Sequence, residues 1–319
     1  MPLRFTIRQL EYLVAVAEAG SIAGAADRVN VSSPSISAAI SQLEADFGHQ
    51  FFIRKHAHGL SLTQTGRQFL IQARKVLHEA RTLNRLADDI SGKVQGTLAL
   101  GCLLTFAQFM APQLRRGFET RHEGVRVTQS ELNHEEIIAG LRAGDLDIAL
   151  TYDLDIPSDL VFLPLVALPP YVILPAAHPL AGRSQVSLAD LRDQPMVLLD
   201  LPFSTEYFLS VFKASGIRPR IAERTRDLAV VRSLVANGFG YAIANIRPLN
   251  ENAPDGRPLR FVPLAGDNRP MVMGLLMAEG SDTILTLRAF VDHCRDVVTE
   301  DSVPGMRMQP WPGPAENRT

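Results

Sequence analysis

Apolar residues recur at helical spacing in three consecutive stretches near the start of the chain. The repeat in residues 6–19 predicts an amphipathic helix, and a second repeat, with Ser21 as a suitable N-cap, predicts another helix up to Val29. A third helix is expected after a short break, with Ser33 as its N-cap and Pro34 at its first position. Two short helices joined by a tight turn after a supporting helix are typical of a helix-turn-helix.

The third helix is expected to have one apolar face and one polar face. Positions spaced four, three and four residues apart form the apolar face: Ile36, Ile40, Leu43 and Phe47. The opposite face carries short side chains: Ser35, Ala38, Ser41, Gln42 and Ala45. A helix with such a face can enter the DNA major groove, which is about 12 Å wide, without steric conflict. A plain three-helix bundle with an inactive exposed face explains the same spacing, so the periodicity alone leaves both interpretations open.

A short hairpin with a basic tip follows the third helix. Residues 51–62 read as two strands around a turn, in which Gly59 supplies the positive φ that a tight hairpin needs. The first strand ends in Arg54 and Lys55, and the turn carries His58. A basic hairpin behind a helix-turn-helix is the arrangement of a wing, which contacts the sugar-phosphate backbone while the helix reads bases. The hairpin therefore favours DNA binding.

Residues 5–66 resemble the DNA-binding domain of LysR-type transcriptional regulators. The residues that carry the resemblance are, in order, Ala25-Ala26, Ser33 to Ser37, Ile40, Leu43-Glu44, Gly48, Phe52, Arg54, Leu62-Thr63 and Gly66. The resemblance implies a regulator that binds double-stranded DNA. It implies that the residues facing the major groove are Ser33, Pro34, Ser35, Ser37, Ser41 and Gln42. The residues that it implies on phosphates are Arg54, Lys55 and His58.

This chain departs from the family's usual pattern on the third helix. The family usually has glutamine where Ser33 stands and longer polar or basic side chains at the positions of Ala38, Ala39 and Ser41. The resemblance therefore implies docking in the groove but does not indicate the target sequence.

The segment from Gln64 to Ile90 is expected to form one long helix capped by Thr63, because it contains no proline or other break. Its apolar positions alternate at spacings of four and three: Phe69, Ala73, Val76, Ala80, Leu83, Ala87 and Ile90. Such alternation is typical of a two-stranded coil, although a single helix packed on its own domain would show it as well. The resemblance implies that this linker helix pairs in a homodimer, with a homotetramer as the larger assembly.

Beyond residue 96 the pattern changes to alternating strands and helices. The expected strands are 97–103, 125–131, 146–151, 171–175, 196–199, 220–224, 241–245 and 271–278. The expected helices are 106–120, 135–143, 188–193, 207–214, 227–237 and 281–298. This alternation predicts a parallel sheet with right-handed crossovers. Residues 164–170 and 254–270 look like crossings between two lobes.

The predicted architecture is a winged helix-turn-helix, a long linker helix and a two-lobed α/β effector domain. The two-lobed design, similar to periplasmic binding proteins, is what the resemblance implies for the second half of the chain. The expected boundaries are 1–63 for the DNA-binding domain, 64–92 for the linker helix, 93–302 for the effector domain and 303–319 for a disordered tail. Within the effector domain we expect lobe I at about 93–165 and 268–302, and lobe II at about 166–267.

Ligands of such sheets bind at the carboxyl ends of strands, where helices begin. Four places in the chain fit this description, the fourth being Thr225–Asp227. The candidate residues at the other three are Cys102, Leu103, Thr105, Asn133, Pro202, Phe203, Ser204 and Thr205. Each of them could be no more than a helix cap. Since the family binds effectors between its lobes, however, these hydroxyl and N–H groups are expected to hold a small molecule such as a carboxylate.

Composition and charge add modest support. The 319 residues are 46% hydrophobic and 21% charged, which is ordinary for a globular protein of two or three domains. The net charge is −2, but residues 1–93 carry +3 and the remainder −5, which is a weak indication of phosphate binding. No apolar run is long enough to span a membrane and the N-terminus does not resemble a signal peptide, so we expect a cytoplasmic protein without membrane contact.

Enzymatic and metal-binding motifs are missing from the sequence. It contains no GxxxxGK[ST], GxSxG or HExxH motif, so no catalytic residue, cofactor or metal is expected. Cys102 at a helix start could be a reactive thiol, but no second cysteine lies near it in sequence. The main alternative from another class is a small-molecule-binding protein with an accessory helical domain.

Overall fold

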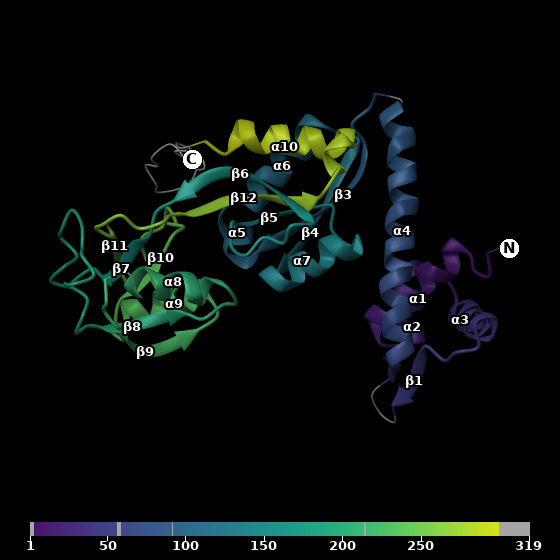
Figure 1. Ribbon diagram of the computed structural model, residues 1–319, viewed down its shortest axis with the longest axis horizontal. Coiled ribbons are helices and arrows are strands. Elements are labelled where there is room, and N and C mark those ends of the chain that lie inside the picture. Colours follow the sequence, from purple (N-terminus) through teal and green to yellow (C-terminus); the bar gives the residue numbers. More distant parts are fainter. Residues whose placement is uncertain (1–2, 56–58, 91, 214, 300–319) are drawn as a thin grey trace, which may run out of the picture. The chain divides into compact units, whose positions relative to one another are not determined.

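The computed structural model describes residues 3–55, 59–90, 92–213 and 215–299 (Figure 1). His58 and the predicted tail at 303–319 therefore lie outside the described residues. The chain divides into two compact units: residues up to 93 together with 139–146 form one, and the other described residues form the second.

The first unit begins with three helices packed around a common core. Its elements are α1 (Ile7–Ala19), α2 (Ile22–Val29), α3 (Ser33–Phe47), β1 (Phe52–Lys55), β2 (Gly59–Leu62) and α4 (Gln64–Ile90). The apolar faces predicted for the helices meet in this core, where Leu13, Val16 and Ile36 are fully buried. Ala25 is fully buried as well, and its small side chain lets α2 pack closely on its neighbours.

Side-chain caps fix where these helices start. Thr6 and Gln9 form a capping box at α1, and the Ser21 hydroxyl accepts a hydrogen bond from the Gly24 N–H at 3.1 Å. The prediction for α3 was wrong by one residue, because its N-cap is Ser32 rather than Ser33. Both are serines, and only the extended backbone of Ser32 allows its side chain to cap the helix.

The predicted hairpin is present and is tied to α3. Strands β1 and β2 pair antiparallel, with Phe52 opposite Leu62. The Glu44 carboxylate on α3 accepts hydrogen bonds from the N–H groups of Phe51 at 2.6 Å and Phe52 at 3.1 Å. Because a charged acceptor strengthens both bonds, Glu44 fixes the first strand relative to the end of α3.

Helix α4 spans the range predicted for the linker. Thr63 caps it, since its hydroxyl accepts a hydrogen bond from the Gly66 N–H at 2.8 Å. Near its start Phe69 and Ala73 pack into the core of the first unit, whereas the side chain of Leu83 is 68% exposed. The apolar stripe therefore packs on its own domain near the start of the helix, and Leu83 farther along is exposed to solvent.

Lobe I of the second unit is a five-stranded sheet in the order β4-β3-β5-β12-β6, with helices packed on it. Its elements are β3 (Gly96–Leu103), α5 (Leu104–Phe109), α6 (Ala111–Arg121), β4 (Val125–Leu132), α7 (His134–Ala143), β5 (Ile148–Tyr152), β6 (Leu160–Leu168), β12 (Met271–Ala278), the 3₁₀ turn η1 (Ser281–Thr283) and α10 (Leu285–Val297). Helix α7 starts in this unit, and its residues 139–143 are assigned to the first unit. Helices α6 and α10 lie side by side on one face (Figure 1), where the rings of Phe118 and Phe290 are 5.0 Å apart.

Three predictions for lobe I need correction. The sheet is mixed rather than parallel, because β12 runs antiparallel to both β5 and β6. The single helix expected at 106–120 is two helices, α5 and α6, with Met110 between them outside helical geometry. Strand β6 is not predicted from the sequence, where Pro164 starts an expected crossing. The proline lies within this edge strand, where a missing N–H is tolerated.

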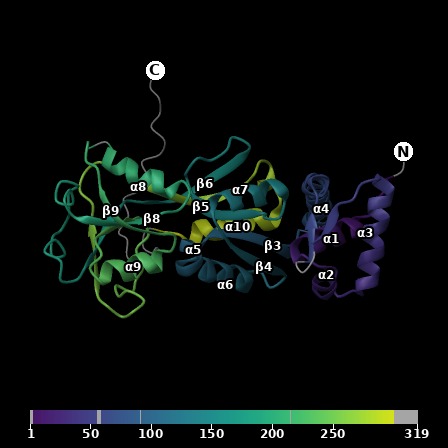
Figure 2. The same cartoon turned by 90° about the horizontal axis from the view of Figure 1, so that it is seen from below.

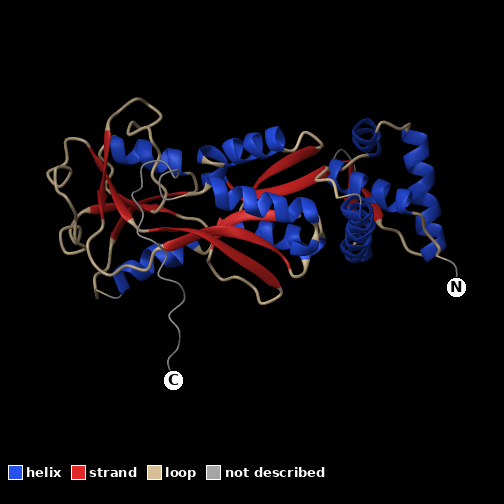
Figure 3. Cartoon of the chain, turned by 90° about the horizontal axis from the view of Figure 1, so that it is seen from above, coloured by secondary structure: helices blue, strands red, loops and turns tan. Residues whose placement is uncertain are grey.

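Lobe II contains two small sheets and two helices. Its elements are β7 (Tyr171–Pro175), β8 (Pro195–Leu199), α8 (Ser204–Lys213), β9 (Arg220–Thr225), α9 (Leu228–Ala236), β10 (Ala242–Ala244) and β11 (Leu259–Pro263). Strands β10, β7 and β11 pair antiparallel, and β8 pairs parallel with β9. Figure 2 shows α8 and α9 on opposite sides of β8 and β9, and Figure 3 shows long loops joining the strands of this lobe.

Lobe II also departs from the prediction in three places. The helix expected at 188–193 is a series of turns, stabilised by the hydroxyl of Ser187 donating to the Asp190 carboxylate at 2.6 Å. Helix α8 starts at Ser204, three residues before the expected start. The segment 254–270 is not only a crossing, because β11 lies within it and pairs with β7.

Candidate functional site

The outer face of α3 is open in the first unit. The residues predicted for this face, Ser35, Ala38, Ser41, Gln42 and Ala45, are all exposed, and so is Ser37. Pro34 is exposed too, and Ser33 is half-buried. The face is therefore a row of short side chains with Gln42 as its longest member. It is free of cover from the other described residues of the first unit.

Gln42 is held in one orientation by its neighbour one turn along the helix. Its Nε2 donates a hydrogen bond to Oδ1 of Asp46 at 2.8 Å. Because an ionised carboxylate can only accept hydrogen bonds, the amide nitrogen must face Asp46. The Gln42 carbonyl oxygen is then the atom left to accept a hydrogen bond from another molecule.

The wing hairpin is anchored on the turn between α1 and α2. The N–H of Leu60 donates to the Gly20 carbonyl oxygen at 2.7 Å. A Cβ at Gly59 would lie 2.5 Å from the same oxygen, so this approach requires glycine. Arg54 and Lys55 lie on β1 opposite Leu60 and Gly59, which brings their backbone to the end of the hairpin.

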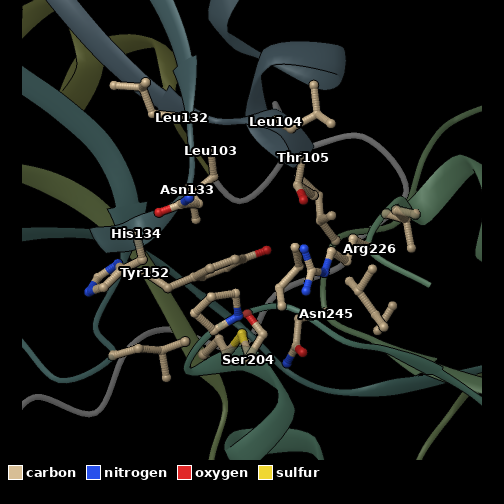
Figure 4. Close-up of a pocket in the computed structure, with 18 of the residues that line it drawn as sticks. Leu103, Leu104, Thr105, Leu132, Asn133, His134, Tyr152, Ser204, Arg226 and Asn245 are labelled. Atoms are coloured by element: carbon tan, nitrogen blue, oxygen red, sulfur yellow. The ribbon is translucent and has the colours of Figure 1, made fainter. Parts of the chain in front are cut away.

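A cavity of about 320 Å³ lies between the two lobes of the second unit (Figure 4). Lobe I contributes, among others, Leu103, Leu104, Thr105, Leu132, Asn133 and Tyr152. Lobe II contributes, among others, Leu199, Pro202, Ser204, Phe208, Arg226 and Ile246. Most of the lining is apolar, with a few polar groups that come from the ends of strands and the starts of helices. Such a composition is typical of a binding site for a small molecule.

Five of the eight residues predicted for a ligand site line this cavity: Leu103, Thr105, Asn133, Pro202 and Ser204. The other three, Cys102, Phe203 and Thr205, are not among its lining residues. Cys102 and Leu103 are neighbours on β3 and point to opposite faces of the sheet, so only Leu103 reaches the cavity. The Thr205 hydroxyl donates instead to Asp200 and to the Leu201 carbonyl oxygen, both at 3.0 Å.

Asn133 has a capping role in addition to its place in the lining. Its Oδ1 accepts a hydrogen bond from the Glu136 N–H at 3.0 Å, and its own N–H donates to the Glu136 carboxylate at 2.8 Å. This reciprocal pair is a capping box at the start of α7. The capping interpretation of Asn133 is therefore correct, and only its side-chain NH₂ group is left for a ligand.

Phe203 joins the two lobes beside the cavity. Its backbone has φ +64°, a left-handed conformation that is rare for a residue with a side chain. Its ring meets the His134 ring edge to face, with 5.0 Å between the centroids. Burial lowers the pKa of His134, whose Nδ1 shares a hydrogen bond of 3.1 Å with the Thr151 hydroxyl. Burial thus favours the neutral form of the His134 ring, which lies in a contact between lobes.

Several polar residues of the lining were missed from the sequence. Tyr152 ends a buried strand and Asn245 follows β10, so the sequence predicts both as core residues and not as part of a ligand site. Asn245 is indeed buried, and its Nδ2 donates to the Leu168 carbonyl oxygen at 2.8 Å and the Tyr207 hydroxyl at 2.9 Å. Arg226 belongs to the fourth predicted place, Thr225–Asp227. Its positive charge is a signal in the sequence that could have identified it as a ligand-binding residue.

The two cysteines are expected to be inert in the native protein. Burial raises the pKa of Cys102 to about 12, with a smaller effect from Glu131, and burial also raises the pKa of Cys294 to about 12. Since the thiolate is the nucleophile, iodoacetamide at neutral pH should leave both thiols unmodified until urea unfolds the chain. Mass spectrometry after alkylation measures this directly. Rapid native modification of Cys102 would instead support a redox-sensing thiol.

Within the described part of the chain, no group of three or more histidine, cysteine, aspartate or glutamate residues is placed to hold a metal ion. Among the described helices, none combines the length and the apolar character that crossing a bilayer requires.

Two family models match the chain. Residues 7–67 match the model described as bacterial regulatory helix-turn-helix protein, lysR family. Residues 91–299 match the model described as LysR substrate binding domain. The first match covers the three helices and the hairpin, and the second covers both lobes around the cavity.

Relatives and solved structures agree with these matches. The small neutral protease regulatory protein of Streptomyces coelicolor is 31% identical over 285 residues, which cover 86% of this chain and 82% of that protein. The crystal structure of HinK, a LysR family transcriptional regulator from Pseudomonas aeruginosa, is 33% identical, with a TM-score of 0.63 and coverage of 93% of this chain and 99% of that chain. Full-length CbnR in complex with its target DNA is 27% identical, with a TM-score of 0.65 and coverage of 92% of this chain and 99% of that chain.

Proposed function

This chain belongs to the LysR family of bacterial transcriptional regulators, and from that premise we propose how its own residues bind DNA and respond to an effector. The observation that carries the proposal is the open face of α3, in which every side chain but one is too short to obstruct a groove. In this proposal Ser33, Pro34, Ser35, Ser37, Ser41 and Gln42 face the major groove, and Arg54, Lys55 and His58 contact phosphates. Regulation of transcription places the protein in the bacterial cytoplasm, where the chromosome lies.

The pairing surface in this proposal is the exposed part of α4. The exposed apolar side chains of α4 include Ile71 and Val76, in turns that pack on the first unit through Ala73 and Leu77, and Leu83 beyond them. Exposed apolar residues along one helix favour burial against a second copy. A homodimer formed in this way presents two copies of α3 to the two halves of a palindrome, and a homotetramer is the larger assembly.

The proposal assigns one function to each of three segments of the chain. Residues 1–63 bind DNA, residues 64–92 form the linker helix, and residues 93–302 bind the effector, with lobe II at about 166–267. The cavity of 320 Å³ between the lobes is the effector site. A ligand that binds one arrangement of the lobes more tightly than another shifts the population, and the shift reaches the DNA through the linker helix. The protein acts by binding rather than by turnover of its ligand.

Gln42 is expected to select among DNA sequences. Asp46 fixes its amide so that the carbonyl oxygen points outward, ready to accept from the N4 amino group of cytosine or the N6 amino group of adenine. Gln42→Ala should therefore change the preference at one base position by about tenfold, in line with ~1–3 kcal/mol for a good base contact. Competition binding with a randomised operator measures the effect.

The matched control for this experiment is Gln72→Ala, which removes an exposed glutamine from α4. Asp46→Ala should also alter the preference, because it frees the Gln42 amide to rotate and make a two-point contact with adenine. A uniform loss of affinity across all sequences in the Gln42 variant would rule out base reading by this residue.

A gel-shift assay with the DNA upstream of the chain's own gene tests the proposal as a whole. Retarded DNA that is released by excess of the same fragment, but not by unrelated DNA, is the expected result. A chain that binds small molecules and no DNA would instead fit the alternative of a binding protein with an accessory helical domain.

A further inference from the structure

The cavity between the lobes has one arginine among its described lining residues and no lysine. Arg226 lies between β9 and the α9 N-cap Asp227, and Figure 4 shows its guanidinium group turned toward the Tyr152 hydroxyl inside the cavity. Two residues earlier, Arg224 pairs with Asp200 at 3.4 Å, whereas no ion pair links Arg226 to a carboxylate in the described ranges. Arg226 is exposed, and without a carboxylate partner among the described residues its guanidinium group is available to pair with an anion bound in the cavity.

Two carboxylates in the lining limit the charge that a ligand can carry. Glu136 already accepts the N–H of Asn133 at 2.8 Å, and Glu131 accepts a hydrogen bond from the Gln129 amide at 2.7 Å. A second anionic group on the ligand would meet these negative charges without another cation to offset them. The lining therefore carries two carboxylates against one guanidinium, so an anion is favoured only where it pairs directly with Arg226, and a second anionic group is disfavoured.

The remaining surface of the cavity is largely apolar. Leucines from both lobes dominate it: Leu103, Leu104, Leu132, Leu199, Leu201 and Leu228. A sugar or another polyol would leave hydroxyl groups without partners against these side chains, at a cost in binding free energy. The hydroxyl groups of Thr105 and Ser204 can form hydrogen bonds with one polar group of a ligand, but not with the several hydroxyl groups of a sugar.

We propose that this cavity binds a small amphipathic monoanion, whose carboxylate pairs with Arg226 and whose aliphatic or aromatic body packs on the leucines. The proposal rests on the proposed function, in which this cavity is the effector site. Arg226 belongs to lobe II, and Thr105 and Tyr152 belong to lobe I. A ligand held by both sides bridges the lobes, which is what a shift between two lobe arrangements requires.

Isothermal titration of the full-length protein with four probes of one chain length tests the charge. The probes are hexanoate, its neutral amide hexanamide, the dianion adipate and the cation hexylamine. Hexanoate should bind about tenfold more tightly than hexanamide, because a charge-assisted hydrogen bond is about twice as strong as a neutral one. Adipate and hexylamine should bind more weakly than hexanoate.

Arg226→Gln should remove the preference for hexanoate over hexanamide, because the amide keeps a hydrogen-bond donor but loses the charge. Arg224→Gln is the matched control, since Arg224 is ion-paired outside the lining, and it should keep the preference. Equal affinity for hexanoate and hexanamide in the wild-type protein, tighter binding of adipate or hexylamine, or no binding of hexanoate would each overturn the proposed ligand class.

Gel shifts without any probe report separately on the proposed function. Arg224→Gln should retard operator DNA as the wild-type protein does, because this arginine lies outside the cavity lining. If the charge preference fails while DNA binding persists, only the ligand class is wrong. If wild-type DNA binding itself is absent, the proposed function is wrong.

Discussion

Gly66→Ala is expected to displace the wing and to abolish specific DNA binding. A Cβ at this position of α4 would lie 2.1 Å from the carbonyl oxygen of Phe51 and 2.9 Å from its carbonyl carbon. Such overlap with backbone is relieved only by moving Phe51, whose oxygen also accepts the N–H of Thr63 at 2.9 Å and whose ring stacks on Phe69 at 4.3 Å. Overpacking in a dense core costs about 3 kcal/mol or more when backbone must shift.

Two measurements check this prediction on the full-length protein. Thermal unfolding should show a lower Tm for the first unit, and gel shifts should show operator affinity reduced at least about a hundredfold, as ~3 kcal/mol implies. Thr65→Ala is the control, because Thr65 is exposed in the same turn and its truncation should change stability by less than about 0.5 kcal/mol. Wild-type Tm and affinity in Gly66→Ala would mean that the helix accommodates the methyl group.

DNA affinity is expected to fall steeply as salt increases. Arg54 and Lys55 on both copies of a dimer place four cations on phosphates, and each neutralised phosphate contributes about 0.9 to the slope of log K against log salt. These four contacts alone give a slope of about −3.6, a loss of roughly 150-fold between 50 and 200 mM salt. Fluorescence anisotropy with labelled operator DNA over this range measures the slope.

Variants at the wing identify the source of the slope. Arg54→Ala should weaken binding to all sequences about equally and lower the slope by about 1.8, which is two contacts in a dimer. Lys213→Ala removes an exposed cation from α8 and should leave the slope unchanged. A salt slope that stays the same in Arg54→Ala would contradict phosphate contact by this residue.

The DNA-binding half of the chain was predictable because its signals are local. The spacing of Ile36, Ile40 and Leu43 fixes which side of α3 is buried, and all three are buried in the structure. Gly59 indicates the hairpin turn, and Thr63 indicates the start of α4 a few residues later. The error at the N-cap of α3 arose because consecutive serines have the same capping chemistry, and only the backbone distinguishes them.

The sheets were less predictable because strand partners lie far apart in sequence. Pro164 argued against a strand, yet β6 is the edge of its sheet and needs no N–H at that position. The direction of β12 depends on where the chain returns from lobe II, so no local pattern could indicate that it runs antiparallel to β5. In the same way, β11 was hidden in a segment that looks like a connection.

The sequence by itself determined the helices of the DNA-binding half, the caps at Ser21 and Thr63, the short side chains on the outer face of α3 and the resemblance to a family. These features depend on residues within one or two turns of one another. Only the tertiary structure brought Tyr152 of one lobe and Arg226 of the other to the same cavity and turned Cys102 away from it. The reason is physical: a cavity is defined by which distant strand ends meet, and that depends on packing and register across the whole second unit.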